Sequence, residues 1–306
     1  MNKANKAILL AICLSLASCN SQNNTSTNSS QNNIVQDVDV IVIAGQSNAE
    51  GCTSWTYLNE EQQSKYREGF ENTLIRFNCN EGANYSRNFV NVKLGQGHQN
   101  TNFGPEVGMA DYFEENYEYL NKKIYLVKYA YGGTALYDKW RSPSSTILGE
   151  KPGELYTGLI NYCDESIEKL NKQGFNPTIR AICWMQGESD AGSVANSYKN
   201  LENNFINDVC SDLAEYNSED TIKFIDAGIS QSPVWQNYQI INNAKKANAE
   251  LDPENRYYID TILEGLTYDL EPASNPDLCH YDSLSMVELG RLFAQTIIEG
   301  AIIEQN

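Results

Sequence analysis

The sequence is poor in histidine and in basic residues. Only two of its 306 residues are histidine, and 22 Lys and Arg stand against 40 Asp and Glu, for a formal net charge of −18. A chain this acidic repels phosphate backbones, so we expect no nucleic acid among its partners. The two imidazoles, His98 and His280, are the few candidates for a base that works near neutral pH.

Cysteine spacings typical of metal sites are also absent. The eight cysteines form no CxxC pair and no Cys/His ligand spacing, so we predict no metal and no cofactor. Six of them lie in the main part of the chain, and the sequence leaves their pairing open: Cys52, Cys79, Cys163, Cys183, Cys210 and Cys279.

No apolar run is long enough for a permanent transmembrane helix. Residues 1–18 are instead typical of a signal peptide, with a basic start, an apolar stretch at 7–17, and the ending Leu-Ala-Ser before Cys19. This ending resembles a bacterial lipobox, in which Cys19 carries lipid. An ordinary secretory signal is the alternative.

Residues 19–36 consist mostly of Asn, Ser, Gln and Thr, which have no apolar surface to bury, and so predict a flexible tether. We therefore expect an exported protein, periplasmic or at the cell surface, that touches a membrane only through a lipid on Cys19.

Residues 37–306 alternate between strand-like and helix-like patterns. Apolar runs predict strands at 38–44, 123–130, 178–185 and 222–229, with weaker candidates at 90–94 and 257–261. Helical periodicity occupies 106–120, 155–172, 198–216, 238–251 and 283–299. This alternation predicts a single α/β domain, a three-layer α/β/α sandwich around a mainly parallel sheet.

Four segments with suitable chemistry follow strands or precede the last helix, where ligands bind in such folds. They are Ser47, Gly132-Gly133, Gln186-Gly187-Glu188, and Asp277 with His280. A serine hydroxyl needs an imidazole to take its proton, and the imidazole needs a carboxylate to orient it. We therefore predict a Ser47, His280 and Asp277 triad.

Two rivals to this triad are present. Ser189 is an alternative nucleophile, although it lacks a comparable entry from a strand. His98 is an alternative base, but no acid lies within several residues of it, which favours a pocket-lining or exposed role. Ala49 stands where a Gly-x-Ser-x-Gly nucleophile elbow needs its second glycine, so the α/β-hydrolase elbow is excluded.

The oxyanion of such a reaction needs hydrogen-bond donors. A backbone N–H at Gly132 or Gly133 can approach it closely because glycine has no side chain. Gln186 offers an amide donor for the same oxygen.

Taken together, these motifs resemble those of SGNH hydrolases, in particular the carbohydrate esterase family 6 and sialate O-acetylesterase-like branch. The resemblance covers most of residues 40–290 and rests on Gly-Gln-Ser-Asn-Ala-Glu-Gly at 45–51, Phe-Gly-Pro-Glu at 103–106, Gly-Gly-Thr at 132–134 with Trp140, Trp-Met-Gln-Gly-Glu-Ser-Asp at 184–190, and Asp277 with His280.

The resemblance implies a flavodoxin-like fold and a metal-independent serine esterase that removes acetyl groups from carbohydrate. It implies that Ser47 is the nucleophile, His280 the base and Asp277 the orienting acid. The oxyanion hole would then combine the Ser47 N–H, a glycine N–H and Gln186. Two departures from the common pattern are Gln186, where SGNH enzymes usually carry asparagine, and Ala49, where methionine is commoner.

The substrate is predicted less sharply than the reaction. We expect acetylated xylan or a related hemicellulose, with O-acetyl sialic acid as the alternative and a non-catalytic glycan-binding lipoprotein as the second alternative. Substrate contacts are expected from four side chains: Gln46, Trp140, Arg141 and Glu188. Trp140 could stack on a sugar or be a core residue, and Arg141 would pair with the carboxylate of a sialate. The oligomeric state is left open.

Overall fold

A mainly parallel sheet forms the core of the computed structural model, which describes residues 36–117, 122–218 and 220–303. Its central strand is β1 (Gln36–Gly45), whose last eight residues are buried. The run is apolar on both faces because helices cover both sides of the sheet. The predicted signal peptide, Cys19 and nearly all of the tether lie outside the described residues.

The strands follow the order β10-β9-β8-β1-β7-β3-β4, and β5 also pairs with β3. The parallel strands beside β1 are β3 (Phe70–Cys79), β7 (Ile124–Ala130), β8 (Phe175–Met185), β9 (Lys223–Ala227) and β10 (Arg256–Ile259). The antiparallel additions to β3 are β4 (Asn84–Tyr85) and β5 (Val90–Val92), while β2 (Thr53–Ser54) pairs with β6 (Asn102–Phe103) in a separate two-stranded sheet.

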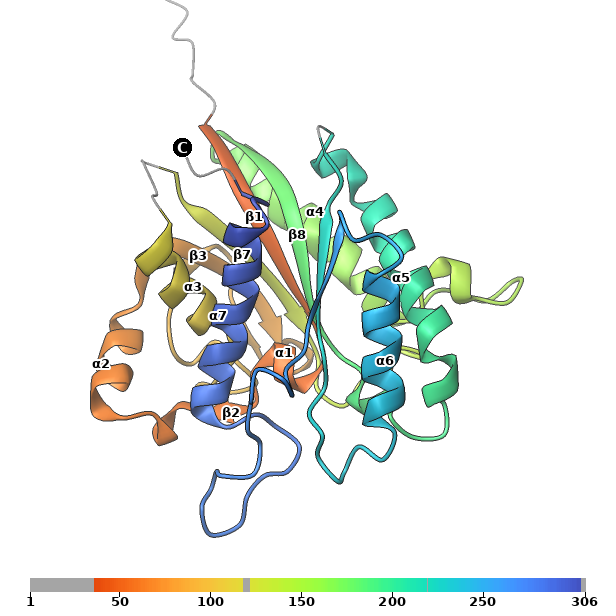
Figure 1. Ribbon diagram of the computed structural model, residues 1–306. Coiled ribbons are helices and arrows are strands. Elements are labelled where there is room, and N and C mark those ends of the chain that lie inside the picture. The colour runs from red at the N-terminus through yellow and green to blue at the C-terminus, as the bar shows by residue number, and fades with distance from the viewer. Residues whose placement is uncertain (1–35, 118–121, 219, 304–306) are drawn as a thin grey trace, which may run out of the picture. The chain divides into compact units, whose positions relative to one another are not determined.

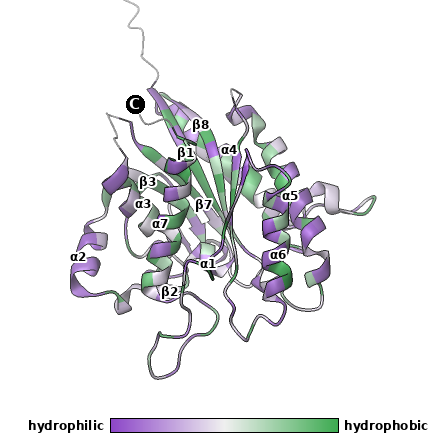
Figure 2. Ribbon diagram, viewed as in Figure 1, coloured by the Kyte–Doolittle hydropathy of each residue, from purple (hydrophilic) through white to green (hydrophobic). Residues whose placement is uncertain are grey.

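The helices are α1 (Ser47–Glu50), α2 (Glu60–Glu68), α3 (Pro105–Asn116), α4 (Glu154–Lys172), α5 (Tyr198–Asp212), α6 (Tyr238–Ala249) and α7 (Ser283–Glu299). Figure 1 shows α7 in front of the sheet and α4 behind it, which confirms the predicted three-layer α/β/α sandwich. Hydrophobic residues concentrate on the central strands, whereas α2 is largely hydrophilic (Figure 2).

Short 3₁₀ turns connect these elements at Trp55–Tyr57, Asn80–Gly82, Pro143–Ser145, Glu188–Asp190, Ala195–Ser197 and Ala214–Tyr216. Internal contacts group the described residues between 36 and 303 into one compact unit. Within the described ranges, no helix combines the length and the apolar character needed to cross a membrane.

All six predicted strands are present, and the differences lie elsewhere. Strand β3 was not predicted because its sequence is mixed: Arg76 is buried, and its guanidinium donates to the Tyr162 carbonyl at 3.1 Å and to Ser166 Oγ at 2.7 Å. Helix α2 was also not predicted, since its residues are mostly polar and exposed. The helix expected over 198–216 ends at Asp212 and continues as a 3₁₀ turn.

Helices α3 and α7 approach each other closely through glycine. A Cβ built on Gly290 would lie 2.0 Å from the carbonyl oxygen of Pro105 and 2.8 Å from the Cα of Gly108. Both obstacles are backbone atoms, so a side chain there can be accommodated only if a helix moves. This contact seats α7 and, with it, the loop that precedes α7.

Gly290→Ala is therefore expected to destabilise the fold by roughly 1–3 kcal/mol, the usual cost of overpacking a close interface. The midpoint of urea denaturation measures this loss. Gly192→Ala is the matched control because a Cβ on Gly192 meets nothing within 4 Å. An unchanged midpoint for Gly290→Ala would contradict the close contact between the two helices.

Candidate active site

The turn after β1 sets the position of Ser47. Gly45 has a φ of +137°, and a Cβ there would lie 2.0 Å from the carbonyl oxygen of Met185 on the neighbouring strand. The Gln46 N–H donates to that same carbonyl at 3.0 Å. The chain thus turns sharply at a residue that must be glycine, and Ser47 becomes the first residue of α1.

The loop before α7 holds the second half of the site. His280 Nδ1 lies 2.6 Å from Asp277 Oδ2, and Asp277 Oδ1 accepts the Cys279 N–H at 2.9 Å. Partial burial raises the pKa of Asp277, but the hydrogen bonds from His280 and the Cys279 backbone outweigh burial and hold that pKa below its usual range. Asp277 is therefore a carboxylate that orients the imidazole.

Ser47 and His280 line one cavity of about 420 Å³, together with Gln46, Gly132 and Gly133. These residues come from the ends of β1 and β7 and from the loop before α7. The structure therefore brings three of the four predicted segments to one cavity, whereas the segment Gln186-Gly187-Glu188 does not line it. Asp277 contacts His280 and lines a smaller neighbouring cavity of about 170 Å³, which His280 also borders.

The buried side chain of Asn48 joins the nucleophile turn to the histidine loop. Its Nδ2 donates to Glu188 Oε1 at 2.8 Å and to the Cys279 carbonyl at 3.5 Å, and its Oδ1 accepts the Tyr281 N–H at 3.1 Å. The two backbone groups flank His280 in the sequence. Asn48 therefore fixes the distance between the residue before it, Ser47, and the imidazole.

The two glycines predicted as oxyanion donors differ. The Gly132 N–H donates to Glu50 Oε2 at 2.9 Å, so a carboxylate already occupies it. The N–H groups of Ser47 and Gly133 make no hydrogen bond to any other described residue. A Cβ on Gly133 would meet nothing within 4 Å, which leaves this backbone open to the cavity.

Gln46 and Gln186 differ in whether their amide groups are available at the cavity. Gln186 is fully buried, and its Nε2 donates to the Thr134 carbonyl at 3.1 Å and to Asp190 Oδ2 at 2.6 Å, away from the cavity lining. Gln46 Oε1 accepts the Ser189 N–H at 3.1 Å, which leaves the Gln46 NH₂ group as the amide donor at the cavity. The sequence pattern instead predicted Gln186 as the amide donor to the oxyanion.

Three of the predicted substrate contacts lie elsewhere. Trp140 is fully buried, and its Nε1 donates to Thr134 Oγ1 at 2.8 Å, so the prediction that it stacks on a sugar is corrected: its ring is a core residue. Arg141 pairs with Glu150 at 3.2 Å, outside the cavity lining. Glu188 is buried against Asn48, and burial raises its pKa. The aromatic side chains that line the cavity are Tyr131 and Trp235.

Both predicted rivals line the same cavity. Ser189 is present there, and its backbone N–H is held by Gln46. His98 is pocket-lining as predicted, but it does have an acid nearby: its Nδ1 lies 3.3 Å from Glu50 Oε2. Sequence separation concealed this pair, because Glu50 lies on α1 and His98 lies in the loop between β5 and β6.

Two cysteines, Cys52 and Cys279, also line the cavity. Burial, followed by the charge of Glu50, raises the pKa of the Cys52 thiol. Burial, followed by the charge of Asp277, raises the pKa of the Cys279 thiol. Because the thiolate is the reactive form, these shifts make both thiols poorer nucleophiles than an ordinary cysteine.

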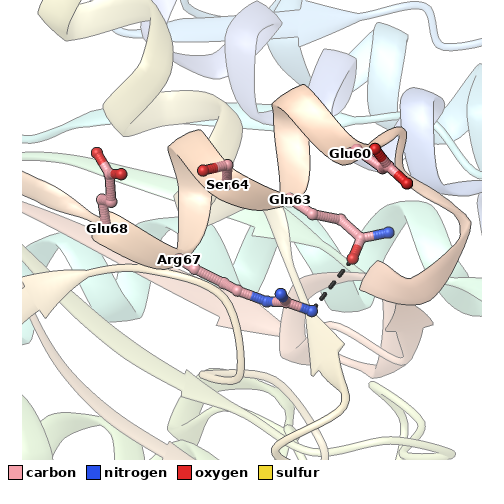
Figure 3. A pocket seen from close by; sticks show the side chains of 5 residues that line it. All are labelled: Glu60, Gln63, Ser64, Arg67 and Glu68. Carbon is pink, nitrogen blue, oxygen red and sulfur yellow. Dashed lines mark hydrogen bonds between the residues drawn. The ribbon is translucent and has the colours of Figure 1, made fainter.

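A second large hollow has no such chemistry. It measures about 510 Å³ and is lined by five residues of α2 alone: Glu60, Gln63, Ser64, Arg67 and Glu68 (Figure 3). Arg67 donates to Gln63 Oε1 at 3.1 Å, and no histidine is present to activate Ser64. The cavity at Ser47 is therefore the candidate active site.

The sequence profile of a carbohydrate esterase family, described as sialic acid-specific acetylesterase, matches residues 37–299. The chain belongs to this esterase family. Membership makes it a carbohydrate acetylesterase, which is a carboxylic ester hydrolase, and confirms the predicted relationship to SGNH-like carbohydrate esterases. No curated protein sequence matches the esterase.

Solved structures share the fold of the esterase at low sequence identity. A protein from Arabidopsis thaliana is 21% identical, with a TM-score of 0.60 over 86% of this chain and 98% of its own. NanS is 17% identical, with a TM-score of 0.58 over 87% of this chain and 98% of NanS. A carbohydrate acetylesterase from Xanthomonas citri is 12% identical, with a TM-score of 0.54 over 86% of this chain and 56% of the Xanthomonas chain.

Asn48→Ala should lower kcat of the esterase by roughly 100-fold with little change in KM, because a small displacement of the base costs that much. Steady-state kinetics on a chromogenic acetyl ester measures the split between the two constants. Asn204→Ala is the control, since its amide also makes two hydrogen bonds, to the Ser144 carbonyl and Ser145 Oγ. Equal kcat values for the two variants would argue against the positioning role.

Asp277→Asn should lower kcat on the order of 10⁴-fold, because an amide cannot fix the imidazole tautomer or stabilise the imidazolium. The exposed Asp269 supplies the control Asp269→Asn, which is expected to keep full activity. The same kinetic assay applies, and a kcat for Asp277→Asn within threefold of the wild type would remove Asp277 from the triad.

Proposed function

We propose that this acetylesterase uses Ser47 as nucleophile, His280 as general base and Asp277 as the orienting acid. The observation that carries the proposal is the 2.6 Å contact between His280 Nδ1 and Asp277 Oδ2, with His280 lining the cavity of Ser47. With Nδ1 held by the carboxylate, Nε2 is the ring atom left to exchange a proton with a serine hydroxyl.

The reaction proceeds in two acyl transfers. Ser47 Oγ attacks the acetyl carbonyl while its proton passes to His280, and collapse of the tetrahedral intermediate returns that proton to the departing sugar hydroxyl. A water molecule then gives a proton to His280 and attacks the acetyl-serine, and as the second tetrahedral intermediate collapses, His280 returns the proton to Ser47 Oγ and acetate is released. The Ser47 N–H, the Gly133 N–H and the Gln46 amide are the proposed oxyanion donors, because these groups are open at the cavity.

For the substrate, we favour a neutral acetylated sugar such as that of xylan. The described residues that line the cavity include Glu50 and Glu81 but neither lysine nor arginine. A sialate would bring its own carboxylate into this acidic site without a cationic partner. The alternative substrate, O-acetyl sialic acid, is supported by the description of the family itself.

Export and a lipid on Cys19 belong to the same proposal. A polysaccharide cannot enter a cell intact, so an enzyme that deacetylates it must work outside. The predicted tether at 19–36 would separate the esterase domain from the membrane surface.

Acetate release from acetylated xylan and from O-acetyl sialic acid tests both the nucleophile and the substrate. We expect acetate release by the wild type and by Ser189→Ala, the control for the rival serine. For both proteins, release from acetylated xylan should be faster than release from O-acetyl sialic acid. Ser47→Ala should be slower by on the order of 10⁶-fold, the scale seen when a triad serine is removed.

Release by Ser47→Ala at the wild-type rate would move the nucleophile elsewhere, and loss of activity in Ser189→Ala alone would move it to Ser189. Faster release from O-acetyl sialic acid than from xylan would show that the alternative substrate, O-acetyl sialic acid, is preferred over the neutral sugar. Binding of glycan without release of acetate from either would favour a non-catalytic glycan-binding protein.

A further inference from the structure

Glu50, Cys52 and His98 form a cluster that the ester hydrolysis mechanism does not use. All three line the catalytic cavity, and one donor atom from each lies within 4.8 Å of the others. The backbone N–H of His98 donates to the carbonyl of Gly51, the residue between Glu50 and Cys52, at 2.9 Å. The backbone therefore holds the imidazole beside the carboxylate and the thiol.

The carboxylate at the centre of the cluster is fixed as well. Glu50 is fully buried, and it accepts the backbone N–H of Asn80 through Oε1 and that of Gly132 through Oε2. These two bonds fix the direction of the carboxylate before anything binds. A preorganised ligand of this kind loses little conformational entropy when it takes up a ligand.

Two of the three separations between donor atoms are close to those between the ligands of a tetrahedral metal ion. Glu50 Oε2 lies 3.3 Å from His98 Nδ1 and 3.8 Å from Cys52 Sγ. Bond lengths of zinc to oxygen, nitrogen and sulfur place neighbouring donors of a tetrahedral site roughly 3.3–3.6 Å apart. Small side-chain adjustments would therefore bring all three donors into a zinc coordination sphere.

Hydrogen bonding alone leaves part of the cluster unexplained. The Cys52 thiol can donate to Glu50 Oε2, but His98 Nδ1, which lies 3.3 Å from the same oxygen, makes no well-aligned hydrogen bond in the described part of the chain. A buried polar atom without a partner is costly. A metal ion between the three groups would satisfy it.

We propose that Glu50, Cys52 and His98 bind a zinc-class divalent cation at the wall of the catalytic cavity. One oxygen, one nitrogen and one sulfur suit zinc, whereas calcium and magnesium prefer oxygen alone. On binding, the Cys52 thiol gives its proton to solvent and becomes a thiolate ligand. Three protein ligands leave the fourth position to water.

An ion at this position takes up space beside the nucleophile. Ser47 and Gly132 border the same cavity, and a Cβ on Gly132 would lie 3.5 Å from the Cβ of Ser47 and 2.9 Å from Glu50 Oε2. We therefore expect bound zinc to compete with the acetyl ester. The cation site itself depends neither on the triad nor on the choice of sugar.

Equilibrium dialysis of the purified, reduced protein against zinc chloride tests the site directly, without substrate. We expect one zinc per chain in the wild type and in Cys279→Ser, the matched control from the other cavity cysteine. Cys52→Ser and His98→Ala should each weaken binding by more than about 100-fold, since even changes outside the ligand set cost about 10–100-fold. Circular dichroism confirms that each variant is folded.

Cobalt substitution identifies the ligand. A thiolate-to-cobalt charge-transfer band is expected in the wild type and in Cys279→Ser, and it should be absent in Cys52→Ser. No stoichiometric binding at millimolar zinc would overturn the proposal. Binding retained by Cys52→Ser, or lost in Cys279→Ser, would overturn it too, because the ion would then lie at other ligands, such as those beside His280.

The competition with substrate is tested separately. Zinc should raise the KM for a chromogenic acetyl ester in the wild type and leave the KM of Cys52→Ser unchanged. A wild-type KM that does not respond to saturating zinc would refute the competition, and equal inhibition of Cys52→Ser would assign the effect to another site.

Discussion

The active site depends on one buried amide. Asn48 occupies the position next to Ser47, the proposed nucleophile, and its side chain contacts both backbone groups that flank His280 as well as the carboxylate of Glu188. Hydrogen bonds in a water-free interior tolerate little displacement, because a lost partner leaves a buried polar group unpaired. The amide therefore acts as a spacer that holds two distant parts of the chain at one separation, and the geometry of acyl transfer follows from it.

The buried ammonium group of Lys128 stabilises this arrangement. Lys128 on β7 donates to Glu106 Oε2 at 2.8 Å and to the carbonyl oxygens of Glu50 and Gln96 at 3.0 and 2.6 Å. Replacing one partner of a buried pair costs far more than the pair contributes to stability, so these residues constrain one another. The ammonium ties the end of α1 to α3 through the Glu50 carbonyl, so the Glu50 carboxylate can accept the N–H groups of Asn80 and Gly132.

The sequence revealed those parts of the molecule that depend on local pattern. Strands with uniform apolar runs and the three-residue spacing of Asp277 and His280 were readable because each lies within one short segment. The polar strand β3 was not, since Arg76 finds its partners on a distant helix. Nor could the sequence decide whether Trp140 packs in the core or stacks on a sugar, or show that His98 meets an acid, because both facts arise only when separate loops are packed together.

The two halves of the site have a consequence for biosynthesis. Asn48 and Tyr281, joined by a hydrogen bond, are 233 positions apart, so the serine leaves the ribosome long before the histidine is made. A nascent chain that has reached only β9 or β10 carries the proposed nucleophile without its proposed base. With the proposed triad, hydrolytic competence thus appears only after the loop before α7 has been made and has docked, and a chain that stalls earlier is chemically inert.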